Sequence, residues 1–212
     1  MGFYETKPAF RKALHPIAKR VAAIHPDVWT WLAVAVCGVA GMFLGVSSRH
    51  PVLLLVIPPL LFLRLLLNVF DGVVAQEAGR SSARGETLSE FADRLADLAV
   101  LGGVAVSGLG QASLAVLAIV VVLLVSYVGI LGKAVGAGRQ YAGPMGKPDR
   151  MVVIMVACIL QYVVWKMGVT PSLVWERSVT VFDWASLVII GLGISTILVR
   201  LRTIFQTLTT KR

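Results

Sequence analysis

Five acidic side chains lie close together in the middle of a chain of which 57% of the residues are hydrophobic. They are Asp71, Glu86, Glu90, Asp93 and Asp97. A carboxylate near the centre of a bilayer costs at least about 2.5 to 3.5 kcal/mol on insertion scales, so the cluster needs cations, a metal ion or water to compensate it. We favour a metal site, because hard divalent cations take oxygen ligands and commonly travel with phosphate groups. A structural network of salt bridges near the membrane surface is the alternative.

Helical geometry sorts these side chains onto two polar faces. At about 100° per residue, one helix gathers within an arc of about 140° the side chains of Glu86, Ser89, Glu90, Asp93 and Asp97. The preceding helix gathers within about 60° the side chains of Arg64, Asn68, Asp71 and Ala75. Two polar faces are therefore available to meet, and Arg64 and Arg94 compensate only part of their negative charge.

The spacing of these residues resembles the signature of the CDP-alcohol phosphotransferase family, also called the CDP-alcohol phosphatidyltransferase family. That signature reads Asp-x-x-Asp-Gly-x-x-Ala-Arg, eight residues, then Gly-x-x-x-Asp-x-x-x-Asp. This chain aligns to it without a gap through Asn68, Asp71, Gly72, Ala75, Gln76, Gly85, Ser89 and Asp93. Three positions depart from it, because Asn68 and Ser89 replace aspartates and Gln76 replaces the arginine. The chain resembles a divergent branch of the family, in which Glu90 follows Ser89.

The resemblance implies a role for each matched position. In the family the aspartates hold two divalent ions against the substrate diphosphate, and the last aspartate deprotonates the acceptor hydroxyl. Asp71 is therefore expected to bind metal, and Asp93 to bind metal and act as the catalytic base. Asn68, Ser89 and Glu90 are expected as further oxygen ligands for one or two ions of Mg²⁺ or Mn²⁺. The positions expected to contact the substrate are Gly72, Ala75, Gln76 and Gly85.

The segment GAGRQYAGPMGKPDR, residues 136–150, is a second dense polar stretch, and its glycines and prolines exclude a continuous helix. Its cations Arg139, Lys147 and Arg150 are candidates for binding a phosphate group or an anionic headgroup. A basic loop that only sets membrane topology explains the same residues equally well. The resemblance favours binding, because the family places cationic acceptor-binding residues in a comparable region.

The elements that must position these residues are membrane helices. A span needs on the order of 20 apolar residues, and six such runs lie at 29–47, 51–76, 86–109, 112–135, 150–169 and 181–203. Before them, hydrophobic residues at helical spacing alternate with Lys and Arg, which predicts an amphipathic helix in the membrane interface. We therefore predict an all-α membrane protein with a single domain, 1–212, in which an interfacial segment, 1–26, precedes six transmembrane helices within 29–205.

The formal net charge of +9 is distributed unevenly along the chain. Most Lys and Arg residues precede the first predicted span, follow the last, or lie in the loops after the second and the fourth. The positive-inside rule then predicts that both termini and the site face the cytoplasm, in the inner membrane. This charge suits membrane lipids and phosphorylated substrates, and we expect no nucleic-acid partner. The resemblance also implies a homodimer.

The expected function is transfer of a phosphatidyl group from CDP-diacylglycerol to an alcohol acceptor, with release of CMP. Three cations in one loop favour a phosphorylated acceptor. The alternative is a family member that binds CDP-lipid without turnover, which the loss of two carboxylates and an arginine would explain. A transporter is disfavoured, because the acidic cluster lies at one membrane face and the midplane runs lack an ionisable path.

Overall fold

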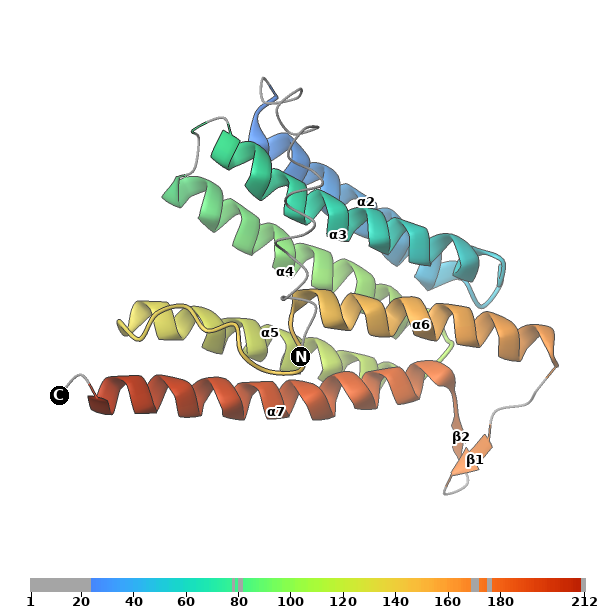
Figure 1. Cartoon of the computed structure of the whole chain (residues 1–212). Coiled ribbons are helices and arrows are strands. Elements are labelled where there is room, and N and C mark those ends of the chain that lie inside the picture. Colours follow the sequence, from blue (N-terminus) through green and yellow to red (C-terminus); the bar gives the residue numbers. More distant parts are fainter. Residues whose placement is uncertain (1–23, 78, 80–81, 169–171, 175–176, 211–212) are drawn as a thin grey trace.

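The computed structural model describes residues 24–77, 79, 82–168, 172–174 and 177–210. Helices dominate this part of the chain, in the order α2 (Pro26–Val46), α3 (Leu53–Glu77), α4 (Ala83–Val106), α5 (Ala112–Ala134), α6 (Lys147–Lys166) and α7 (Val181–Thr210). Successive helices alternate in direction (Figure 1). As a result, α2 and α4 begin at the end of the bundle where α3, α5 and α7 finish, on the left of Figure 1. We call this end the site end.

Each of the six predicted apolar runs coincides with one helix, which confirms the helical prediction. The helices follow the runs because a long apolar segment must satisfy its backbone hydrogen bonds internally when water is excluded. The last helix continues beyond the predicted residue 203 to Thr210, since the sequence there contains neither glycine nor proline to stop it.

Local caps fix where α4 and α6 begin. The Ser82 hydroxyl accepts a hydrogen bond from the Gly85 amide at 3.1 Å, which caps the first turn of α4. At the start of α6, the Asp149 carboxylate accepts from the Gly146 amide at 2.8 Å, and Pro148 occupies the first turn. These caps determine the positions from which the acidic face of α4 and Lys147 extend.

The helices pack as two connected groups. One consists of α2 with α3 and α4, and the other of α5 with α7. The groups are joined by direct contacts of α4 with α5 and by α6, which packs against both α3 and α7. The crossing of α2 and α4 is close: a Cβ added at Gly41 would lie 2.2 Å from the Ala99 carbonyl oxygen. A Cβ at Gly103 would lie 2.3 Å from the Gly41 carbonyl oxygen. Glycine therefore sets the distance between these two helices.

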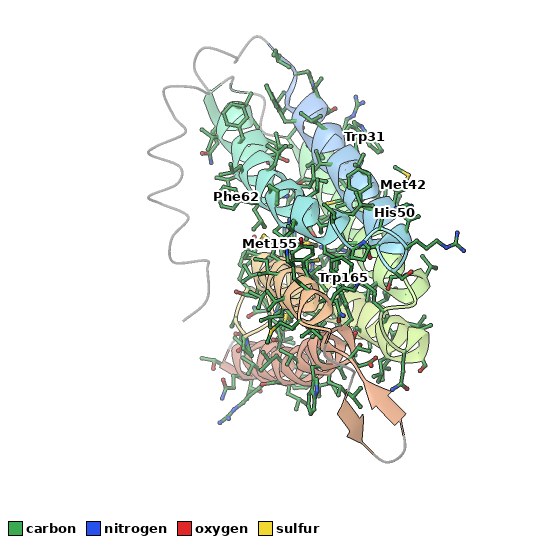
Figure 2. The ribbon with its side chains drawn as sticks, turned by 90° about the vertical axis from the view of Figure 1, so that its right-hand side faces the viewer. Trp31, Met42, His50, Phe62, Met155 and Trp165 are labelled. Carbon is green, nitrogen blue, oxygen red and sulfur yellow. The ribbon has the colours of Figure 1, made fainter. Side chains whose placement is uncertain are left out.

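The outer surface of the bundle is apolar, as in an integral membrane protein. Within the described residues, α2, α3, α5, α6 and α7 are long and apolar enough to cross a membrane. Figure 2 shows Trp31 and Met42 on α2 and Phe62 on α3 directed outward, with exposed fractions of 48%, 64% and 49%. α4 is not among these candidate spans, because the acidic face occupies its N-terminal half, so five of the six predicted transmembrane helices are supported.

The predicted all-α class is confirmed, with one small addition to the helices. A short antiparallel hairpin, β1 (Ser172–Val174) with β2 (Arg177–Val179), lies between α6 and α7. Strands of three residues are too short to produce a readable alternation of polar and apolar residues. The predicted interfacial segment, 1–26, falls almost entirely outside the described residues and stays a prediction.

Candidate active site

Four positions of the sequence signature line one small pocket at the site end. Asn68 and Asp71 come from α3, and Ser89 and Asp93 come from α4. Thr30 on α2 and Arg64 on α3 complete its polar lining. We call this the motif pocket. The two polar faces expected from the helical wheel therefore do meet, and they meet against α2.

Asp71 is the least compensated carboxylate of the motif pocket. Its side chain is 8% exposed and accepts a hydrogen bond from the Thr30 hydroxyl at 3.1 Å. Within the described part of the chain it forms no ion pair with Lys or Arg. A buried carboxylate without a cation is costly, so Asp71 is well suited to receive a positively charged ligand.

Asp93, in contrast, is surrounded by donors. Its Oδ1 accepts from Arg64 Nη2 at 2.8 Å and from Asn68 Nδ2 at 3.0 Å, while Lys147 Nζ contacts its Oδ2. The side chain is 2% exposed. The charge of Asp93 is therefore balanced by cations from α3 and from the start of α6.

The loop before α6 reaches the acidic face of α4. Arg139 forms an ion pair with Glu90 and lies 3.6 Å from a carboxylate oxygen of Glu86. Lys147 Nζ lies 2.9 Å from Glu90, so one lysine bridges Glu90 and Asp93. These contacts bring together predicted metal ligands and predicted acceptor-binding cations.

Arg150 contacts a different acid. Its Nη2 donates to Asp97 Oδ2 at 2.6 Å, and both residues are almost completely buried. The Nε of Arg94 lies 3.6 Å from the same oxygen. This pair connects α4 to α6 deeper in the bundle than the pairs made by Arg139 and Lys147.

A cavity of about 430 Å³ opens beside the motif pocket and shares Thr30, Asp71 and Ser89 with it. We call it the large cavity. The four signature positions predicted to contact the substrate line it, namely Gly72, Ala75, Gln76 and Gly85. Of the three predicted acceptor-binding cations, Arg139 lines it, whereas Lys147 and Arg150 do not. Its remaining wall includes Glu86, Glu90 and Arg139 as well as Arg84 from the first turn of α4. A volume of this size is in the range of small-molecule sites.

A second, smaller pocket adjoins the large cavity and is strongly basic. Glu90 and Arg139 line both. We call it the basic pocket. Its cations come from α4, from the loop before α6, from α6 and from α7: they are Arg94, Arg139, Lys147, Arg150 and Arg200. Glu90 is its one acidic lining residue among those described, and Arg94, Arg139, Lys147 and Arg150 already form ion pairs with Glu90, Asp93 or Asp97. The pocket has a volume of only about 20 Å³, so an anionic group enters it only when these side chains turn.

The donor atoms of the motif pocket fit a hard divalent cation. Asp71 offers a carboxylate without an ion pair, and the Nδ2 of Asn68 points to Asp93, which leaves its Oδ1 as an acceptor. Ser89 adds a hydroxyl oxygen to the same pocket. All of these are oxygen ligands, which Mg²⁺ and Mn²⁺ prefer. In the described ranges, no group of three or more His, Cys, Asp or Glu side chains could hold a metal ion. A metal ion in this pocket would therefore need the neutral oxygens of Asn68 and Ser89 as further ligands.

Two polar residues that line the site, Thr30 and Arg200, are not among the site residues predicted from the sequence. Thr30 is the one hydroxyl residue of an apolar helix, and such residues usually bond their own backbone. Arg200 lies near the end of the last predicted span, 181–203, close to the cations that follow it. The structure places it inside α7, where it is 6% exposed and donates to the Val125 carbonyl at 2.7 Å. The sequence does contain a signal for Arg200, because a cation within an apolar run indicates a functional or structural role.

Comparison with known proteins identifies similar chains. Inner membrane protein YnbA of Escherichia coli is 29% identical over 197 residues, which cover 88% of this chain and 94% of that protein. Phosphatidylinositol phosphate synthase of Mycolicibacterium smegmatis is 28% identical, covering 71% of this chain and 69% of its own length. The crystal structure of phosphatidylinositol phosphate synthase from Mycobacterium tuberculosis with CDP-DAG bound superposes with a TM-score of 0.70 at 19% identity, covering 92% of this chain and 94% of that one.

A second crystal structure of the Mycobacterium tuberculosis enzyme, in complex with manganese and citrate, has a TM-score of 0.66 at 20% identity, covering 94% of this chain and 88% of that one. The model of the CDP-alcohol phosphatidyltransferase family matches residues 23–204. That match includes every predicted site residue and all the described helices except the end of α7. The chain therefore belongs to the CDP-alcohol phosphatidyltransferase family.

Proposed function

We propose that this protein transfers a phosphatidyl group from CDP-diacylglycerol to a phosphorylated alcohol and releases CMP. One observation carries the proposal: the large cavity, which six of the eight signature positions line, shares Glu90 and Arg139 with the basic pocket. A donor diphosphate in the first and an acceptor phosphate in the second would lie next to each other. Two relatives are named phosphatidylinositol phosphate synthases, and this name describes a lipid product that contains a phosphorylated inositol.

In the proposed reaction, the acceptor hydroxyl oxygen forms a bond to the phosphorus that carries diacylglycerol. The bond from that phosphorus to the bridging oxygen breaks, and CMP leaves with the electron pair. The proton of the hydroxyl passes to a carboxylate oxygen of Asp93. A divalent ion held in the motif pocket by Asp71, Asp93, Asn68 and Ser89 would neutralise charge on the diphosphate and the leaving group. Glu90, the fifth predicted ligand, lines the adjacent large cavity instead.

The contacts of Asp93 support a phosphorylated acceptor in particular. Lys147 contacts both Asp93 and Glu90, so its ammonium group must move away before Asp93 can accept a proton. Lys147 and Arg139 are each 19% exposed at the side chain and can turn toward an anion in the basic pocket. An acceptor phosphate would attract both cations, whereas a neutral or amine acceptor would leave them on the carboxylates.

The test is CMP release by the purified protein from CDP-diacylglycerol with Mg²⁺ or Mn²⁺ and a panel of acceptors. Glycerol phosphate and inositol phosphate are compared with glycerol, inositol and ethanolamine, and lipid products are separated by thin-layer chromatography. We expect products from phosphorylated acceptors alone. Arg139→Ala is expected to raise the apparent KM for the acceptor about tenfold. Lys133→Ala is the matched control, because Lys133 pairs with Glu86 and lies outside the basic pocket.

Products from unphosphorylated alcohols alone would contradict the acceptor assignment. An Arg139→Ala variant with unchanged acceptor KM but weaker CDP-lipid binding would move Arg139 to the donor. The alternative, a protein that binds CDP-lipid without turnover, is favoured by one observation: cations of the chain itself form ion pairs with Asp93 and Glu90. Binding of CDP with no CMP release from any acceptor would support that alternative.

A further inference from the structure

The cations of the site differ in whether an acidic residue already compensates them. Six form ion pairs with the acidic face of α4: Arg64, Arg94, Lys133, Arg139, Lys147 and Arg150. Arg84, in the first turn of α4, forms no ion pair with any described residue. It nevertheless lines the large cavity together with Asp71 and Gln76. Arg84 is therefore an exposed cation at the wall of this cavity, without a counterion among the described residues.

The acids of the large cavity do not compensate Arg84 either. Glu86 pairs with Lys133 and Arg139, and Glu90 pairs with Arg139, Lys147 and Arg94. Asp27 lies 3.5 Å from His25, and Asp71 accepts from Thr30. The cavity thus holds an unpaired carboxylate, Asp71, in the motif pocket and an unpaired guanidinium, Arg84, at the start of α4. That combination suits a metal ion together with a multiply charged phosphate ligand.

We infer that Arg84 binds the diphosphate of the cytidine nucleotide donor. The inference rests on the proposed function and adds a residue outside the sequence signature. Gln76, which also lines the large cavity, occupies the signature position of an arginine and brings no charge. Arg84 supplies a cation to the same cavity from the neighbouring helix. A guanidinium can donate two parallel hydrogen bonds to phosphate oxygens, which an amide at position 76 cannot do with equal strength.

The experiment measures binding of CDP and of cytidine to the detergent-purified protein by isothermal titration calorimetry in the presence of Mn²⁺. Arg84→Gln is expected to weaken CDP binding about tenfold and to leave cytidine binding unchanged, because cytidine has no phosphate. Arg84→Lys is expected to retain part of the affinity. Arg202→Gln is the matched control, since Arg202 is an exposed arginine on α7 that lines neither cavity and forms no ion pair with described residues.

A compensating variant makes the test specific. Adding Gln76→Arg to Arg84→Gln restores a cation to the large cavity and is expected to recover most of the lost CDP affinity. Equal CDP affinity in the parent and in Arg84→Gln would overturn the role of Arg84 while leaving the proposed function intact. A parent protein that binds no CDP with any divalent ion would instead overturn the proposed function, and the role of Arg84 with it. A similar loss of CDP and cytidine affinity would also overturn the inference, because it would indicate altered cavity shape.

Discussion

The two aspartates of the motif pocket differ in how far neighbouring cations balance their negative charge. Asp93 is held by Arg64, Asn68 and Lys147, whereas Asp71 has the Thr30 hydroxyl. A divalent ion that enters the pocket therefore gains most from Asp71. Around Asp93 it competes with a lysine, which is mobile and can be attracted elsewhere.

Asp71→Asn is accordingly expected to abolish metal-dependent activity. Loss of an outer partner of a metal ligand commonly costs 10-fold to about 100-fold in affinity, and loss of a ligand should cost at least the upper value. The measurements are Mn²⁺ affinity by isothermal titration calorimetry and CMP release. Asp27→Asn is the control, because Asp27 lines the large cavity outside the signature and contacts His25. Unchanged turnover in Asp71→Asn would exclude Asp71 as a ligand.

The signature positions could be predicted from the sequence because their spacing places them on one face of each helix. The structure brings Asn68, Asp71, Ser89 and Asp93 to one pocket, as the helical wheel indicates. The partners of the acids could not be predicted in the same way. That Lys147 rather than Arg94 bridges Glu90 and Asp93 depends on how the loop before α6 folds back, and no periodicity encodes this.

At the scale of elements, α4 is the helix that organises the site. It contacts α2 through the Gly41 and Gly103 crossing and meets α6 through ion pairs. The length and limits of the helices follow from apolar runs and from end signals such as Ser82 and Pro148. Which helices pack together does not follow from these signals, because membrane helices are apolar on most faces and small-residue contacts decide their neighbours.

The pair formed by Asp97 and Arg150 provides a test of how α4 and α6 are joined. Asp97→Asn leaves the Arg150 guanidinium buried without its counterion, and breaking a buried pair in this way costs about 3–5 kcal/mol. We expect a lower midpoint in thermal unfolding of the detergent-purified protein. The double variant Asp97→Leu with Arg150→Met removes both charges and is expected to recover most of the loss. Glu86→Gln is the control, since Glu86 is 45% exposed at the side chain and its pair is screened by water.

If Asp97→Asn melts at the temperature of the parent, the pair does not hold α4 to α6. If the double variant is as unstable as the single one, the side chains contribute through packing rather than charge. Double-variant analysis separates these outcomes, because residues in direct contact are not additive.

The molecule as a whole concentrates its polar chemistry at one end. The motif pocket, the large cavity and the basic pocket all lie at the site end, where cations of the loop before α6 meet the acidic face of α4. The remaining outer surface of the described helices is largely apolar. Under the proposed function, a water-soluble acceptor and the lipid donor CDP-diacylglycerol would reach the same site from different phases, which requires the site end to lie at the membrane surface.

The positive-inside rule predicts that the site end faces the cytoplasm, and cysteine labelling tests this directly. Both native cysteines, Cys37 and Cys158, are fully buried, so the parent protein is expected not to react with a membrane-impermeant maleimide. Ser48→Cys places a thiol after α2, at the end opposite the site, and Thr209→Cys places one at the exposed end of α7. In bacterial spheroplasts we expect labelling of Ser48→Cys alone, and labelling of both variants after permeabilisation. The reverse pattern in intact spheroplasts would place the site on the outer face, where cytoplasmic CDP-diacylglycerol headgroups could not reach it, and would contradict both the predicted orientation and the assignment of the large cavity to this donor.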